Sequence, residues 1–277
     1  MTAVDADRTD RVDRPAALGW FLAGAVGWSW GLWGLASWLD PGGGLGEALT
    51  IAGRFGPSLA AIVVVSALTG RRGIGRLLAS LRRWRAPAHL WAITILGPPA
   101  VVLAAIAVAS AWGTPPGEFN DPATAYLAIP AFVVILIVGG PLGEELGWRG
   151  FALDRLQARL SPVTASLVLG VVWGLWHLPL FLDPGQVQHG LPLGIYLGQT
   201  ITTAVVYTWL WNITRSLPIV LVLHTMTNLA AGVFPLLRPD APNDTAFTAA
   251  VALAGAGAVA LVVVTRGRLG RDTDAVR

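Results

Sequence analysis

The sequence predicts an all-α, polytopic membrane protein with about eight transmembrane helices and both termini in the cytoplasm. Of its 277 residues, 54% are hydrophobic and only 13% are charged. The apolar residues form blocks of about 20, and a helix of that length crosses the ~30 Å hydrocarbon core of a bilayer. The arginines fall almost entirely in alternate connecting segments, which is the charge asymmetry of a multi-pass protein.

The predicted elements are eight apolar segments, with boundaries read from the points where polar residues resume. In chain order they are residues 17–39, 51–69, 90–112, 125–142, 163–182, 193–211, 217–237 and 247–265. Residues 17–265 are expected to form a single transmembrane helical domain with a motif-bearing core at 125–237. A polar tail at 1–16 precedes this domain, and a basic tail at 266–277 follows it. Both tails are expected in the cytoplasm.

The arginines orient these segments. Every basic residue other than histidine is Arg, and all but Arg54 and Arg238 fall in the tails or in loops on one side of the eight segments. That side is cytoplasmic by the positive-inside rule. The basic composition therefore needs no nucleic-acid partner, and the bilayer of the cell membrane is the expected surrounding. Cysteine is absent, which excludes disulfides, thiolate zinc ligands and a thiol nucleophile.

The first of three polar motifs ends the fourth segment, at Glu144, Glu145 and Arg149. Ionisable groups inside a bilayer are costly unless they are paired or hydrated, so they mark candidate functional sites. Residues four apart share a helix face, which predicts that Glu145 pairs with Arg149 as a structural clamp. Glu144 is rotated by about 100° from Glu145 and stays available for chemistry.

The second and third motifs lie inside the fifth and seventh segments. Trp173 and His177 are four residues apart, and so are His224 and Asn228. Each pair therefore points its two side chains in one direction. A single intramembrane histidine is usually just hydrogen-bonded to a neighbouring helix. Three polar motifs on successive helices favour one shared site.

A helical hairpin is needed to bring these motifs to one depth. The fourth helix is predicted to continue past Arg149 to Leu160 and to fold back at Ser161 and Pro162, with the tip in the cytosol. Glu144 then lies about 25 Å above the tip on one arm, and His177 lies about 24 Å above it on the other. With His224 on the same level, we expect all three side chains to meet just below the cytoplasmic face.

The three motifs, Glu-Glu-x-x-x-Arg, aromatic-x-x-x-His and His-x-x-x-Asn, resemble those of the CAAX-protease and bacteriocin-processing family. This group of intramembrane endopeptidases includes the type II CAAX prenyl proteases and the bacterial Abi proteins. The motifs run from Glu144 to Asn228, and the matching helical core is about half of the chain. One departure is Trp173, which stands where the family usually has Phe.

The resemblance implies roles for the motif residues. Glu144 would activate water, His177 would be its partner, and His224 with Asn228 would stabilise the oxyanion. Glu145, Arg149 and Trp173 would support the site. The implied substrate is a peptide or protein with an apolar or lipidated C-terminal segment, such as a CAAX sequence, cut near the cytoplasmic face.

Three alternatives stay open from the residues themselves. Glu144, His177 and His224 satisfy the ligand preferences of zinc, so a metal-bound water is as well supported as a metal-free site. Polar groups inside spans also mark ion or solute transporters, although no inverted repeat is visible. A non-catalytic immunity or scaffold protein could keep the same residues for structure.

Overall fold

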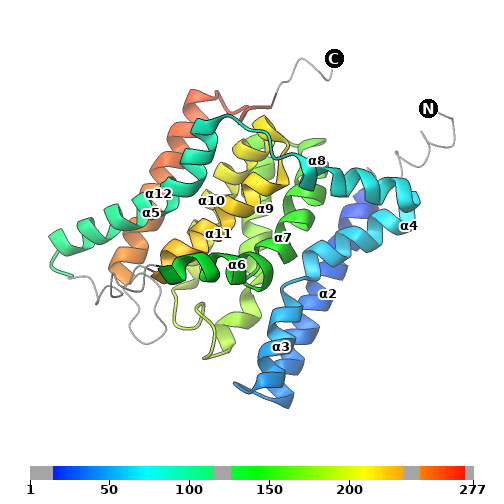
Figure 1. The fold of residues 1–277 in the computed structure, drawn as a ribbon, viewed down its shortest axis with the longest axis horizontal. Helices are drawn as coiled ribbons and strands as arrows, with labels where there is room; N and C mark the ends of the chain where they lie inside the picture. The colour runs from blue at the N-terminus through cyan, green and yellow to red at the C-terminus, as the bar shows by residue number, and fades with distance from the viewer. Residues whose placement is uncertain (1–14, 115–125, 234–243, 272–277) are drawn as a thin grey trace.

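The computed structural model describes residues 15–114, 126–233 and 244–271, and these fold into helices with no strand among them (Figure 1). The prediction of an all-helical chain is confirmed for this part. Residues 1–14 and 272–277 of the predicted tails lie outside the described residues, as does the end of the seventh predicted span. The helices and helical turns are α2 Pro15–Leu39, α3 Gly44–Gly53, α4 Gly56–Ala79, η1 Ser80–Arg82, α5 Ala88–Ala111, α6 Ala128–Val138, α7 Pro141–Gly147, η3 Trp148–Leu153, α8 Asp154–Gln157, α9 Pro162–Trp176, η4 Leu178–Leu182, α10 Leu193–Thr214, α11 Leu217–Val233 and α12 Asp244–Val264.

Several of these helices have the length and apolarity of membrane spans. Gly56–Arg82, Ala88–Ala111, Pro162–Leu182 and Thr245–Val264 qualify singly, and Ala128–Val138 with Pro141–Gln157 makes a fifth if the bent pair is one span. Helices α2 and α10 are long enough, at 25 and 22 residues, but are less apolar because of their Gly, Trp and Thr content. The count of eight spans stays a prediction.

The fourth predicted span is broken near its C-terminal end. Helix α6 ends at Val138, and the chain bends by 45° before α7 begins at Pro141. Gly140 has φ +120°, a conformation that side-chain-bearing residues rarely adopt. Pro141 then starts the new helix at a position where its missing N–H costs nothing. The break places Glu144 in the first turn of α7 rather than in the middle of a longer helix.

The predicted hairpin forms at the expected residues. From Pro141 the chain stays helical through the π-helical stretch η3 to the end of α8 at Gln157. It then reverses so that α9 begins at Pro162, and the Ser161 side chain caps α9 by accepting a hydrogen bond from the Thr164 amide. The two arms of the hairpin therefore run back along each other toward Glu144 and His177.

The two ends of the helix bundle differ in charge. At one end Arg215 makes a bidentate ion pair with Asp154 at 2.7 and 2.5 Å, and the exposed Arg82 and Arg83 follow α4. This end carries the tip of the hairpin. At the other end lie α3 and the segment after α9, at the bottom of Figure 1, while α8 lies toward the top. We call these the arginine-rich end and the α3 end.

Candidate functional site

Two glycines allow α7, the helix that carries the glutamates, to lie directly against the start of α4. A Cβ atom on Gly143 would lie 2.4 Å from the carbonyl oxygen of Arg54, and one on Gly147 would lie 2.4 Å from that of Pro57. Small residues four apart allow two membrane helices to approach this closely. The Ser58 hydroxyl also donates to the Leu142 carbonyl over 3.0 Å. The position of α7 is therefore fixed by backbone contacts on both sides of the glutamates.

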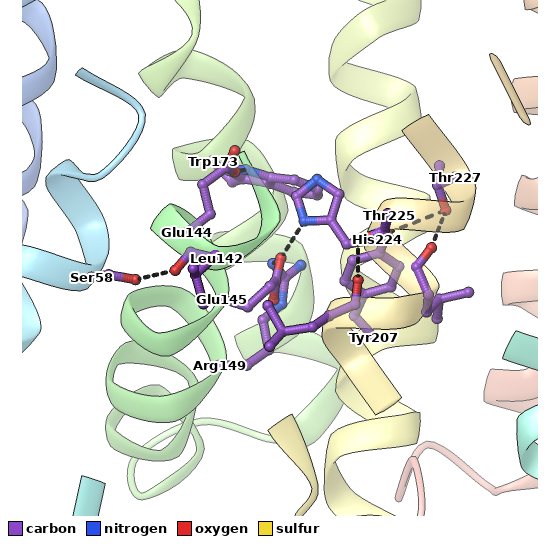
Figure 2. Close-up of polar contacts among 12 residues, drawn as sticks. Ser58, Leu142, Glu144, Glu145, Arg149, Trp173, Tyr207, His224, Thr225 and Thr227 are labelled. Atoms are coloured by element: carbon purple, nitrogen blue, oxygen red, sulfur yellow. Dashed lines mark hydrogen bonds and ion pairs between the residues drawn. The ribbon is translucent and has the colours of Figure 1, made fainter. Parts of the chain in front are cut away.

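Glu145 and Arg149 form the predicted clamp. Arg149 Nη1 donates to Glu145 Oε1 over 2.8 Å, and both side chains are completely buried. The same Oε1 atom lies 2.7 Å from His224 Nδ1 (Figure 2). The Arg149 guanidinium is stacked between the Trp173 and Tyr207 rings, 4.6 and 4.7 Å from their centroids. This buried cluster ties α7 and η3 to α9, α10 and α11.

Glu144 has a different partner from its neighbour. The Trp173 indole lies beside Glu144 (Figure 2), and its Nε1 donates to Glu144 Oε2 over 2.6 Å. The other oxygen, Oε1, lies close to Gly140. A Cβ atom at position 140 would lie 2.3 Å from this oxygen, so only glycine fits beside the carboxylate. Glu144 is thus held by one neutral donor, whereas Glu145 is held by an arginine and a histidine.

His177 lies at the C-terminal end of α9, near Trp173 and Glu144. Its Nδ1 lies 2.8 Å from the Trp173 carbonyl, which can only accept, so Nδ1 carries the proton and Nε2 is left for other partners. The imidazole also packs edge-on against the rings of Trp176 and Tyr196. The orientation of the ring is therefore set by one hydrogen bond and two aromatic neighbours.

A cavity of about 810 Å³ joins these residues. Glu144, His177, His224 and Asn228 all line it, as does Trp173, so the structure brings the four predicted catalytic side chains and one supporting side chain together. The cavity extends to the α3 end of the bundle. Its further walls come from the last turns of α2, from α3, from the end of α6 and from residues 180–191. Glu145 and Arg149 lie behind the wall and not on it.

The region that carries the site matches the model of a known protein family. Residues 126–230 match the model described as type II CAAX prenyl endopeptidase Rce1-like. The helical core of the chain, residues 126–230, is therefore similar to the type II CAAX prenyl endopeptidases. All seven residues proposed from the motifs, from Glu144 to Asn228, fall inside the matched segment of this family.

A curated relative agrees with the family assignment. The chain is 29% identical over 142 residues to the CAAX prenyl protease 2 of Methanococcus maripaludis. The matched part covers 47% of this chain and 51% of that protein, so the chain spans about half the length of the curated relative it matches. The similarity to known proteins covers the helical core that carries the motifs.

A zinc site would need several His, Asp or Glu side chains close together. Within residues 15–114, 126–233 and 244–271, no three His, Asp or Glu side chains are placed to hold an ion together. His224 and His177 each use Nδ1 on a protein oxygen, and Glu144 accepts from Trp173. These contacts leave Nε2 of both imidazoles available, as in zinc-binding histidines, so the zinc alternative that the sequence left open remains open.

Three features of the site were not predicted from the sequence. The motif spacing gave Trp173 only an aromatic packing role, but its indole N–H contacts Glu144. Tyr207 was not singled out, because a tyrosine inside an apolar segment resembles ordinary packing. Arg54 was not proposed as a site residue, yet it lines the cavity. An arginine inside a predicted span is itself the signal that points to Arg54.

Proposed function

We propose that the protein is an intramembrane endopeptidase that hydrolyses a peptide bond with a water activated by Glu144. One observation carries this proposal: two adjacent carboxylates have different partners. Glu145 neutralises Arg149 behind the wall, while Glu144 lines the cavity and is held by a neutral indole. A carboxylate that forms no direct ion pair is better suited to accept a proton than one that is paired with an arginine.

The proposed reaction uses the cavity residues in order. Glu144 takes a proton from water as the water oxygen attacks the carbonyl carbon of the substrate. Donors from His224 and the Asn228 amide stabilise the oxyanion that forms. The C–N bond then breaks as the proton passes to the leaving amine, directly from Glu144 or through His177. Trp173 fixes the direction of the Glu144 carboxylate throughout.

The cavity walls support an apolar substrate. Trp33, Trp176, Leu180 and Tyr196 line the cavity, so apolar side chains surround the polar groups. We propose a peptide or protein with an apolar or lipidated C-terminal segment, as the name of the relative, CAAX prenyl protease 2, suggests for that protein. The proposed location is the cell membrane, with the helices crossing it several times.

The membrane face at which substrate enters follows from the two ends of the bundle. The cavity extends to the α3 end, where Asp40, Glu47 and Asp183 line it. The arginine-rich end is the cytoplasmic one by the positive-inside rule. We infer that substrate reaches Glu144 from the opposite face, and cleavage just below the cytoplasmic face stays the alternative that the sequence predicts.

The deciding experiment measures cleavage of a peptide panel by purified protein and by the Glu144→Ala variant. Loss of cleavage with an intact fold supports the protease. Loss of solute flux in vesicles, with no cleavage by either protein, supports the transporter. An unchanged cellular phenotype in the variant supports the scaffold. Repeating the assay with a chelator tests zinc, since lost activity that Zn²⁺ restores would require a metal-bound water.

A further inference from the structure

Arg54 lies at the junction of α3 and α4 and lines the same cavity as Glu144. Its side chain is half-buried and is held by two hydrogen bonds. Nη1 donates to the Val138 carbonyl over 2.9 Å, and Nη2 donates to Gln186 Oε1 over 3.2 Å. These bonds join α6 to the segment after α9 across the cavity. The guanidinium is therefore positioned and not free to sweep through solvent.

The backbone of Arg54 is fixed relative to the glutamates. Its carbonyl oxygen lies 2.4 Å from the place that a Cβ of Gly143 would take, and Gly143 directly precedes Glu144. Arg54 and Glu144 are also close enough to interact electrostatically. The cation thus stands at a set place beside the proposed catalytic carboxylate, on a segment outside residues 126–230.

The charge of Arg54 is not neutralised by its hydrogen bonds. Both acceptors are neutral oxygens, and a guanidinium has five N–H donors, of which these bonds use two. Three carboxylates also line the cavity. Asp40 accepts from the amides of Leu45 and Gly46, and Asp183 accepts from the Gly185 amide. Among the residues that the structure describes, Glu47 is the carboxylate besides Glu144 that attracts Arg54 electrostatically.

We propose that Arg54 binds the C-terminal carboxylate of the peptide substrate. A guanidinium presents parallel donors that match a carboxylate, and such charge-assisted bonds are about twice as strong as neutral ones. Anchoring that carboxylate beside Glu144 fixes which bond is cut, and so it sets how many residues are released. This inference rests on the proposed function and deepens it, because it identifies the C-terminus itself as what the cavity recognises.

The test compares three peptides of one sequence. The first has a free C-terminal carboxylate, the second a C-terminal amide, and the third an amide after a final Asp. The measured quantity is the ratio of kcat/KM for the acid peptide to that for the amide peptide. For the wild type we expect a ratio on the order of ten or more, the effect of a hydrogen bond to a charged group. Arg54→Gln should bring this ratio close to one.

Two further variants separate recognition from structure. Arg54→Lys keeps the charge without the fork, so an intermediate ratio is expected. Arg82→Gln removes an exposed arginine at the far end of the α4 segment and should keep the wild-type ratio. A purely structural Arg54 would lower cleavage of both peptides by the same factor and leave the ratio unchanged, which would overturn the proposal.

The remaining outcomes are equally decisive. A wild-type ratio near one contradicts the proposal, and so does cleavage of the Asp-amide peptide as fast as the acid peptide, which would assign Arg54 to a side-chain carboxylate. If the wild type cleaves none of the peptides, the proposed function fails. Binding of the acid and amide peptides to the wild type and Arg54→Gln then decides: a preference for the acid that the variant loses supports the inference, and equal binding overturns it.

Discussion

The Trp173 indole donates a 2.6 Å hydrogen bond to the Glu144 carboxylate, across from α9 to α7. The donor, Trp173, stands at the one motif position where the sequence departs from the family that it resembles, in which Phe is usual. A phenylalanine ring could keep the packing but not the donor. The departure therefore changes how the proposed base is held, and it leaves the aromatic wall of the cavity in place.

Replacing Trp173 tests this contact. We expect Trp173→Phe to lower kcat/KM by about tenfold, because one hydrogen bond to a charged group is lost while an aromatic ring remains. Trp173→Ala should cost far more, since it also removes the ring over Arg149 and against His224. Initial rates on one peptide measure both effects. Equal losses in the two variants would mean that the ring, and not the hydrogen bond, matters.

The two glutamates should differ in stability as well as activity. Glu145→Gln leaves the buried Arg149 without its counter-charge, which costs about 3–5 kcal/mol. Glu144→Gln keeps an oxygen that accepts from Trp173, so its stability should be close to wild type. Thermal unfolding in detergent, followed by tryptophan fluorescence, compares them. A Tm for Glu144→Gln as low as that for Glu145→Gln would argue against the separate roles.

The close contact between α7 and α4 should not tolerate a methyl group. In Gly147→Ala the new Cβ would meet the Pro57 carbonyl at 2.4 Å, and overpacking of this kind costs about 1–3 kcal/mol. Gly31→Ala is the matched control, because nothing lies within 4 Å of a Cβ there. The Tm should fall for the first variant only. A Gly147→Ala protein as stable as wild type would mean that the two helices separate easily.

Single cysteines test the orientation, since the natural chain has none. Gln157 is unsuitable as a reporter because it is buried and shares two hydrogen bonds with Asn212. The neighbouring Ala158 is exposed and can report on the hairpin tip, and the exposed Val187 can report on the cavity. We expect an impermeant thiol reagent added outside cells to label Val187→Cys and spare Ala158→Cys. The reverse pattern would place the cavity on the cytoplasmic face.

Local spacing predicted the features that depend on a single helix or turn. Glu145 and Arg149 pair because they are four residues apart, and Ser161 with Pro162 ends one helix and begins the next. Helical rise alone then brought Glu144 level with His177. Contacts between helices were beyond this reasoning, because spacing does not say which neighbour a side chain faces. The bond between Glu145 and His224, 79 residues apart, is one such contact.

Other differences come from backbone conformation. The segment 51–69 was predicted as one span, but its first residues end the short helix α3, and α4 begins only at Gly56. The break at Gly139 and Gly140 was hidden because both residues lie within or beside an apolar run. Hydropathy records how apolar a segment is and not where its helix axis changes direction.

Two parts of the chain form the cavity, and only one of them lies within the segment that matches the family model. The glutamate, histidine and asparagine side chains lie within residues 126–230, whereas Trp33 and Arg54 lie outside them. On the proposed function, the hydrolytic side chains and the residues that select the peptide come from separate segments. We then expect substitutions along residues 33–54 to change which peptide is cut while the hydrolytic side chains stay in place.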